Sequence, residues 1–317
     1  MLGICVIYLV PDAESACLLP LSIRQIKLHT RGDYRIYGCA LRLGDDQVAH
    51  LHREGVELPE LTPSPTTGRA EHAHYLDRLV DHAFAEGCSH VATFDMDSWP
   101  ICEDWNGICE GLVSEHVPVA SVVRAEIGDD FPFPALTYLT REFWKAGQSS
   151  FSATQRGRSA DEHPRDDNRL QETGSGILAQ LRQEGRTFAP LYRTNTWDPH
   201  PIMCGVYADL VFHLGAGSRA PHFVTDREEF SRNGSAVRDG YRLHVNAARR
   251  EFFLAELQVR HDSFMRELVT PGATPIGDRV RGWPDSEVTS RARKRVQRGF
   301  RSGLARALHR LGSRLQS

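Results

Sequence analysis

The chain has 317 residues, of which 40% are hydrophobic and 25% are charged, the composition of an ordinary globular protein. No apolar run approaches the roughly 18 residues that are needed to cross a bilayer. The seven cysteines are scattered, with no Cys-x-x-Cys pair. We therefore expect no membrane span, disulfide framework or cysteine zinc site, and we expect a cytoplasmic protein.

The net charge of −3 is distributed unevenly along the chain. Residues 291–317 contain nine Lys or Arg and no acid, so residues 1–290 carry a net charge of −12. Because surfaces of opposite charge attract different partners, we expect the body and the tail of the chain to contact different partners.

The first third of the chain alternates predicted strands and helices. Residues 4–10 are typical of a strand, and no basic segment precedes them as a signal peptide would require. A helix with apolar positions at Leu18, Leu21, Ile26 and Leu28 follows, and residues 34–43 form the next predicted strand. Strands separated by helices predict an α/β fold with a mostly parallel sheet and right-handed crossovers.

Two acids follow the second predicted strand. In an open α/β sheet, ligands bind at the carboxyl ends of the strands. Asp45 and its neighbour Asp46 are therefore candidates to contact a ribose or a base. A solvated turn at Gly44-Asp-Asp explains the same residues equally well.

A proline-rich connection, residues 59–65, leads to a helix that we expect to begin at about Arg69, with Thr66 and Thr67 offering an N-cap. Free backbone donors, the helix dipole and the Arg69 guanidinium suit a diphosphate, and His72 lies close by in the first turns. The competing interpretation is that His72 is simply packed or solvated.

The stretch from His90 to Pro100 contains the most informative motif. Residues 91–94 are a short run of apolar and β-branched character, which predicts a buried strand, and Asp95-Met-Asp97 follows at once. Two carboxylates at the carboxyl end of a strand can share one divalent cation. Alternatively, Asp97 only caps a helix near Glu103.

The next segments are less specific. Residues 117–123 predict a further strand, and residues 131–144 are rich in aromatics and prolines, as in a sugar-stacking pocket wall or an ordinary core seam. Residues 148–168 are polar and lack periodicity, which is typical of a loop and suggests a lid.

Glu172 stands at or before the start of a helix that buries Ile177, Leu178 and Leu181 and that Gly185 ends. A carboxylate there can accept a proton from a bound hydroxyl, which is the general-base role. It can equally be an acid that is stabilised by the helix dipole. Asp166 and Asp167 compete with it for the role of base.

A second potential ligand group follows a predicted strand or short helix at residues 202–210. His213 precedes a loop with two glycines and Arg219, which allows the backbone to approach phosphate oxygens closely. With Asp95 and Asp97, His213 would complete a mixed oxygen and nitrogen sphere that suits Mn²⁺ or Mg²⁺, and the imidazole favours manganese.

These parts resemble, in type and in order, the GT-A glycosyltransferases, especially the family 2-like group, over about residues 3–220. The resemblance rests on the first strand, the Asp-x-Asp at 95–97, the acid near 172 and the His-x-Gly-x-Gly-Ser-Arg at 213–219. It implies a GT-A-like domain that transfers a sugar from a nucleotide-diphospho-sugar donor to a sugar, lipid-linked or small-molecule acceptor.

Carried over residue by residue, the resemblance implies that Asp95 and Asp97 hold the metal on the donor, that His213 joins them and that Arg219 lies near the diphosphate. Glu172 becomes the base of an inverting reaction. The chain departs from the family pattern there, because Gln171-Glu172-Thr173 replaces the usual Glu-Asp pair. The alternatives are a sugar-nucleotide nucleotidyltransferase, although no Gly-rich phosphate loop with Lys follows the first strand, and a non-catalytic sugar-nucleotide-binding protein.

The C-terminal third changes character. Residues 1–220 would form the catalytic domain and residues 221–270 a helical extension with a long helix at 247–268, followed by a linker at 271–290. Residues 291–317 predict a basic amphipathic helix that suits an anionic membrane surface. Docking on the acidic body, a contact between protomers and disorder are its alternatives, and we expect no nucleic-acid partner.

Overall fold

A computed structural model describes residues 1–125, 129–146, 149–152, 173–195, 203–215 and 236–269, with the side chains of the last segment described from residue 253. The chain divides into two compact units. The first unit comprises Met1–Val123, Phe131–Tyr192 and Tyr207–His213, and the second comprises Arg124–Asp130, Arg193–Val206 and Leu214–Ser317. The predicted domain boundary at residue 220 and the tail at 291–317 lie outside the described residues.

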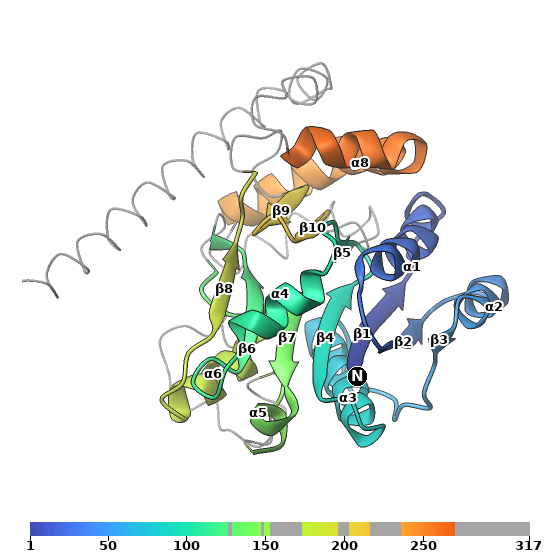
Figure 1. Cartoon of the computed structure of the whole chain (residues 1–317). Helices are drawn as coiled ribbons and strands as arrows, with labels where there is room; N and C mark the ends of the chain where they lie inside the picture. The colour runs from blue at the N-terminus through green and yellow to red at the C-terminus, as the bar shows by residue number, and fades with distance from the viewer. Residues whose placement is uncertain (126–128, 147–148, 153–172, 196–202, 216–235, 270–317) are drawn as a thin grey trace, which may run out of the picture. The chain divides into compact units, whose positions relative to one another are not determined.

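A seven-stranded sheet with the order β3-β2-β1-β4-β7-β6-β8 forms the centre of the first unit (Figure 1). Its strands are β1 (Leu2–Leu9), β2 (Tyr34–Leu41), β3 (Val56–Glu57), β4 (His90–Asp95), β6 (Val119–Val123), β7 (Phe133–Thr140) and β8 (Ala189–Tyr192). Six strands run parallel, and β7 runs antiparallel to its neighbours β4 and β6. The predicted α/β class with a mostly parallel sheet is confirmed.

The position of β7 decides between two interpretations of one segment. The aromatic and proline-rich segment at 131–144 was expected to form a pocket wall or a core seam, and most of it is a buried eight-residue strand inside the sheet, as a core seam requires. Burial explains its composition, because a strand with neighbours on both edges and helices on both faces needs apolar side chains all along it. Its antiparallel direction agrees with the prediction of a sheet that is mostly, but not wholly, parallel.

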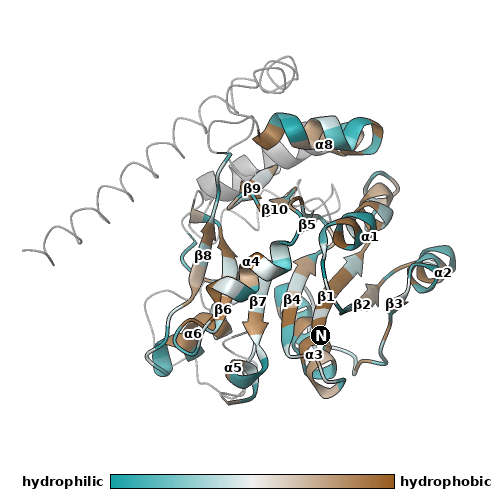
Figure 2. Ribbon diagram, in the orientation of Figure 1, coloured by the Kyte–Doolittle hydropathy of each residue, from teal (hydrophilic) through white to brown (hydrophobic). Residues whose placement is uncertain are grey.

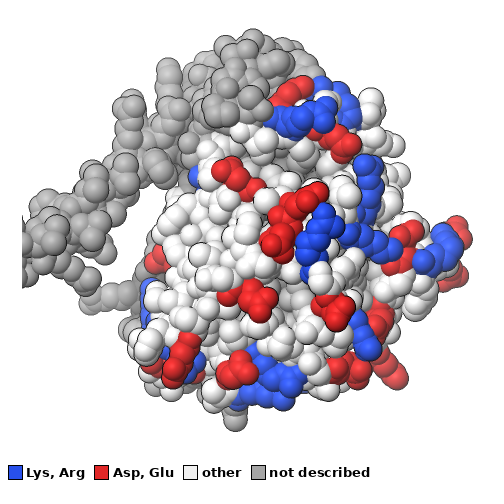
Figure 3. Space-filling model, in the orientation of Figure 1, with Lys and Arg blue, Asp and Glu red and all other residues white. Residues whose placement is uncertain are grey.

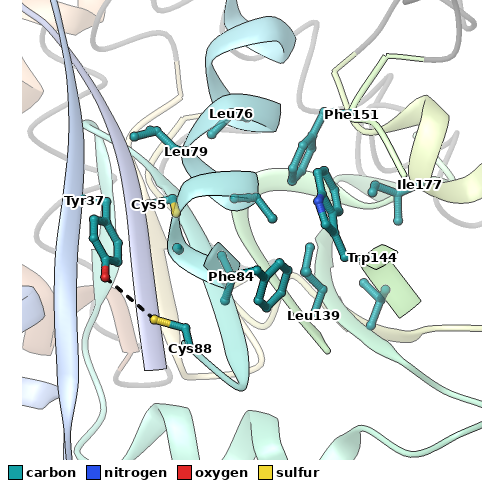
Figure 4. Packing of buried hydrophobic residues seen from close by; sticks show 14 of the residues in the cluster. Cys5, Tyr37, Leu76, Leu79, Phe84, Cys88, Leu139, Trp144, Phe151 and Ile177 are labelled. Carbon is teal, nitrogen blue, oxygen red and sulfur yellow. Dashed lines mark hydrogen bonds between the residues drawn. The ribbon is translucent and has the colours of Figure 1, made fainter. Parts of the chain in front are cut away.

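Helices cover both faces of the sheet. The α3 helix (Arg69–Ala85), α5 (Arg141–Ala146) and α6 (Ser175–Gln183) share one buried cluster with the sheet, in which Trp144, Phe151 and Ile177 lie together (Figure 4). On the other face, Trp105 at the start of α4 (Trp105–Leu112) packs edge-on against Phe94 of β4 and donates to Thr30 after α1 (Leu18–His29). Sheet strands are mostly apolar in Figure 2.

Three local predictions need correction. The α3 helix begins at Arg69 as expected, but its N-cap is Gly68, and neither Thr66 nor Thr67 caps it. The side chain of Leu28 is exposed, and not part of the buried side of α1. A helix that was not predicted, α2 (Asp45–Arg53), follows β2, so Asp45 lies in a first helical turn instead of a loop.

A smaller three-stranded sheet has the order β5-β10-β9. Its strands are β5 (Ser98–Pro100), β10 (Val211–His213) and β9 (Gly205–Tyr207), each three residues long. The strand or short helix that was predicted at 202–210 is therefore a short strand. The sequence did not reveal β5, because three residues that end in proline carry no periodic signal.

The second unit contains the long helix α8 (Ala236–Val269), which begins earlier than the predicted residue 247. Its backbone leaves helical geometry at Arg260, whose guanidinium makes ion pairs with Glu256 and Glu267 across the break. Among the helices that the structure describes, none combines the length and the apolar character that a membrane crossing requires. In the view of Figure 3, acidic and basic side chains are intermixed, without a large patch of one sign.

Candidate functional site

The Asp-x-Asp motif forms the turn between the end of β4 and the start of β5. Asp95 is the last residue of β4, and Ser98 is the first of β5. The Asp95 N–H donates to the buried Ser98 hydroxyl at 3.0 Å, and the same oxygen lies 2.8 Å from the carbonyl of Ala135 in β7. This hydroxyl therefore ties the turn to the neighbouring strand and fixes the direction in which the two carboxylates leave it.

Strand register places His213 at this turn. The β10 strand pairs antiparallel with β5, and His213 lies opposite Ser98, the residue after Asp97. His213 Nε2 is 3.7 Å from Asp97 Oδ1, too long for a direct hydrogen bond, and the imidazole lies against the ring of Phe133 with a centroid separation of 5.5 Å. Two residues more than 110 positions apart thus face one small space within the first unit.

Asp95, Asp97 and His213 form a potential cation site at the carboxyl edge of the sheet. One ligand atom from each lies within 4.8 Å of the others. Ligands of one Mg²⁺ at bonds of about 2.1 Å lie between about 3.0 Å and about 4.2 Å apart, so side-chain movements on the order of an ångström bring the three groups into joint coordination. Two carboxylates and one imidazole offer the hard oxygen and borderline nitrogen donors that suit Mg²⁺ or Mn²⁺. The residues present therefore fit a divalent cation.

The alternative in which Asp97 only caps the following helix is wrong. The helix after the motif, α4, has Asp104 as its N-cap residue, and Asp97 is seven positions earlier, buried at the start of β5. A buried carboxylate needs compensation by hydrogen bonds or by a cation. Its position next to His213 therefore favours the functional interpretation over helix capping.

His72 contacts the site from the first turns of α3. Its Nε2 lies 3.0 Å from Oδ1 of Asp95, a hydrogen-bond distance, and its side chain is 27% exposed. His72 therefore contacts a predicted metal ligand. Its predicted contact with a donor stays a prediction.

The amino end of α3 is held firmly at this edge of the sheet. Gly68 adopts a φ of 70° before the helix, and Nη2 of Arg42, after β2, donates to both carboxylate oxygens of Glu71 at 3.0 and 2.9 Å. The Thr173 hydroxyl donates to the carbonyl of Arg69 at 3.4 Å. Arg69 is thus at the helix start as predicted, and its contact with a diphosphate remains a prediction.

Asp45 is the remaining predicted residue that the structure describes, and it is not among the residues of this cluster. It is exposed in the first turn of α2, beyond the carboxyl end of β2, which is the same edge of the sheet. Glu172, Arg219 and the competing bases Asp166 and Asp167 lie outside the described residues, as does all of the predicted lid at 148–168 except residues 149–152. Their roles stay predictions.

Sequence reasoning missed Ser98, which supports the turn of the site, and Asp77, which ties α3 to the segment at residues 150–151. Ser98 has the local signal of a hydroxyl three positions after Asp95, a spacing that is common where side chains bond to nearby backbone. Asp77 on α3 is buried and accepts from Ser150 Oγ at 2.6 Å and from the Phe151 N–H at 2.7 Å. It had no local signal, because a single acid in an amphipathic helix normally faces solvent.

Thiols close to this edge of the sheet are poor nucleophiles. Burial, with a smaller contribution from the charge of Glu71, raises the pKa of Cys39 to about 12. Burial likewise raises the pKa of Cys5 on β1. Because the thiolate is the reactive form, covalent catalysis through these two cysteines is disfavoured.

No family model and no curated protein matches the sequence. Among solved structures, the chain is similar to a mannosyltransferase from Pyrobaculum calidifontis in complex with GDP-Man and Mn²⁺, with 13% identity and a TM-score of 0.43 over 96% of this chain and 86% of that one. It is also similar to TarS residues 1–349 from S. aureus, with 10% identity and a TM-score of 0.39 over 95% and 92%.

A cytidylyltransferase from Leptospira borgpetersenii is similar over 60% of this chain and 74% of its own, with 9% identity and a TM-score of 0.36. These similar structures thus include a mannosyltransferase and a cytidylyltransferase. At such identities and scores, the function of this chain has to be derived from its own residues.

Proposed function

We propose that the protein is a metal-dependent glycosyltransferase that moves a sugar from a nucleotide-diphospho-sugar to an acceptor hydroxyl. The observation that carries this proposal is the convergence of Asp95, Asp97 and His213 at the carboxyl end of β4. These three residues would hold Mn²⁺ or Mg²⁺. A cation there supplies charge stabilisation for the diphosphate that leaves when the anomeric bond breaks.

The chain's own groups would assist in the same reaction. The amino end of α3 presents backbone N–H groups and Arg69 to an anion, and Arg219 follows the His213 strand in sequence. His72 and Asp45 complete the set of residues that we propose for donor binding. Most of these groups act on developing negative charge, which is where preorganised donors contribute most to rate.

Glu172 is our candidate for the general base. The acceptor oxygen would attack the anomeric carbon while its proton passes to Glu172 and the bond to the diphosphate oxygen breaks, so a single displacement inverts the configuration. Replacing Glu172 by Gln should abolish turnover and leave metal-dependent nucleotide binding intact. Full activity of E172Q would refute this role for Glu172 and return Asp166 and Asp167 as candidates.

A thermal-shift panel tests the donor class. Nucleoside diphosphates should raise the melting temperature in the presence of Mn²⁺ and much less without it, because ligands that bind only the folded state stabilise it. Analysis of the products then separates the two enzyme classes. A transferase releases nucleoside diphosphate, whereas a nucleotidyltransferase would release pyrophosphate, and binding without turnover would indicate a non-catalytic protein.

We further propose that the protein is cytoplasmic and peripheral to an anionic membrane through residues 291–317, which carry nine basic residues and no acid. The full chain should sediment with vesicles that contain anionic lipid, and a chain that ends at residue 290 should not. Equal sedimentation of both chains would refute membrane binding by the tail and would leave the enzymatic proposal untouched.

A further inference from the structure

One imidazole next to the proposed cation site is not part of the cluster of three ligands. His72 Nε2 lies 3.0 Å from Asp95 Oδ1, whereas His213 Nε2 lies 3.7 Å from Asp97 Oδ1. The first distance is that of a close polar contact, and the second is that of two groups facing a common space. The two histidines therefore relate to their carboxylates in different ways.

We propose that His72 is a positioning residue for the metal ligand Asp95, acting through the contact of its Nε2 with Oδ1, where a small rotation of the ring would direct its N–H at the oxygen. This inference rests on the proposed metal-dependent function and adds a role to the donor contact proposed for His72 above. A hydrogen bond formed in this way occupies one carboxylate oxygen and leaves the other for the cation. Groups that orient metal ligands in this way are common around protein metal sites.

Exposure explains why Asp95 needs such a partner more than Asp97 does. The Asp97 side chain is 3% exposed, so the surrounding packing restricts its rotation, whereas that of Asp95 is 16% exposed. A carboxylate that water can reach samples several rotations about its terminal bond. A hydrogen bond to one of its oxygens reduces that freedom before the metal binds.

The helix that carries His72 is rigid enough for this role. Ala73, the next residue, is 1% exposed, and α3 packs on the sheet through buried positions along its whole length. The ion pair between Arg42 and Glu71 adds a contact at the first turn. Side chains on such elements hold a geometry more accurately than side chains on loops do.

The competing role for His72 is that of a fourth protein ligand to the cation. The two roles predict different spectra and different responses to substitution. Glutamine keeps an N–H donor near the position of Nε2, so it can replace a positioning hydrogen bond. It has no imidazole nitrogen to give to the metal.

The test uses the full chain with Mn²⁺ alone as the probe. The Mn²⁺ dissociation constant is measured by electron paramagnetic resonance for wild type, His72→Ala and His72→Gln, and electron spin-echo modulation reports imidazole nitrogens bound to the ion. His74→Ala is the matched control, because His74 lies on the same helix, is half-buried like His72 and bonds the Thr62 carbonyl instead. Circular dichroism checks that each variant is folded.

We expect H72A to weaken Mn²⁺ binding about 10- to 100-fold, with H72Q and H74A close to wild type and the nitrogen signal of one imidazole unchanged in all variants. An unchanged affinity in H72A, or the loss of a nitrogen coupling together with failure of H72Q to restore affinity, would overturn the inference. A wild-type chain that binds no Mn²⁺ would refute the metal site itself, and with it the proposed function.

Discussion

The candidate site contains two carboxylate–imidazole pairs that are held in different ways. Asp97 and His213 are buried, with side chains 3% and 6% exposed, and the pairing of β5 with β10 brings them together. Asp95 and His72 are 16% and 27% exposed, and the second of them comes from a helix. The buried pair is placed by backbone register, and the open pair by side-chain contact.

This difference indicates that the two pairs have different roles in the site. A buried carboxylate is costly unless a cation or hydrogen bonds compensate it, so the buried pair should depend most on the metal. Solvent reaches the open pair, Asp95 and His72. The phosphate oxygens of a donor can therefore approach the same side chains. We expect substitutions in the buried pair to have larger effects than matching substitutions in the open pair.

The largest effect should come from Asp97→Asn. The change removes a charged ligand from the buried pair, so Mn²⁺ binding should be lost, and kcat/KM should fall by more than about a thousandfold, which is about 4 kcal/mol of transition-state stabilisation. Calorimetric titration with Mn²⁺ and steady-state assays measure both.

Asp95→Asn should lower Mn²⁺ affinity and kcat/KM less than Asp97→Asn does, because water or a donor oxygen can fill the more open position. Asp33→Asn, in the loop before β2 at the opposite edge of the sheet, is the matched control and should behave as wild type. Equal losses of Mn²⁺ affinity and kcat/KM in D97N and D95N would contradict the distinction between the two pairs.

His213→Gln tests the choice of metal. Replacing an imidazole nitrogen by an amide oxygen should reduce the preference for Mn²⁺ over Mg²⁺, with Mn²⁺ affinity lowered about 10- to 100-fold. Competition between the two ions, followed by the Mn²⁺ resonance signal, measures the preference. A variant that retained the wild-type preference would show that His213 is not a ligand.

Ser98→Ala tests the support of the turn. The hydroxyl is fully buried and accepts the Asp95 N–H, so its removal leaves a buried donor without this partner. We expect the free energy of unfolding to fall by about 1–3 kcal/mol, measured by urea denaturation. Ser114→Ala, at an exposed serine, is the control and should cost a few tenths of a kcal/mol at most. A cost in S98A no larger than in S114A would mean that the hydroxyl does not support the turn.

The sequence predicted those parts of the site that have a strong local pattern. The run at 91–94 and the periodic positions of α3 reveal β4 and a helix that begins at Arg69, because burial on one face leaves a regular trace. The carboxyl end of β4 and the amino end of this helix lie at the same edge of the sheet, because in an open α/β sheet the helices begin at the edge where the parallel strands end.

The rest depends on contacts between distant segments. The contact between His213 and Asp97 requires two strands of three residues, too short for any periodicity, and the antiparallel direction of β7 is decided by its partners. The short helix α2 is polar and mostly exposed (Figure 2), so it has little hydrophobic pattern to detect. Local sequence therefore predicted the long, buried elements and missed the short or polar ones, α2 and β5, together with the strand pairings.

The smallest expected effect lies at the other end of β4, where His90 stacks on Tyr138 with a centroid separation of 5.4 Å. Burial lowers the pKa of His90, and the charges of Glu110 and Glu142 oppose this only in part. The unfolded chain, with an ordinary histidine pKa of about 6.5, then binds a proton before the folded chain does. Stability should therefore fall as the pH drops below about 6.5.

The contribution of His90 should stay below about 1 kcal/mol, since solvent screens a half-buried group. His90→Phe keeps a ring against Tyr138 and should flatten the dependence of the melting temperature on pH between 7 and 5. His52→Phe, at an exposed histidine of α2, should leave that dependence as it is in wild type. A wild-type pH dependence in H90F would assign the acid sensitivity to other groups, and the histidines of the metal-site pairs would be the next to test.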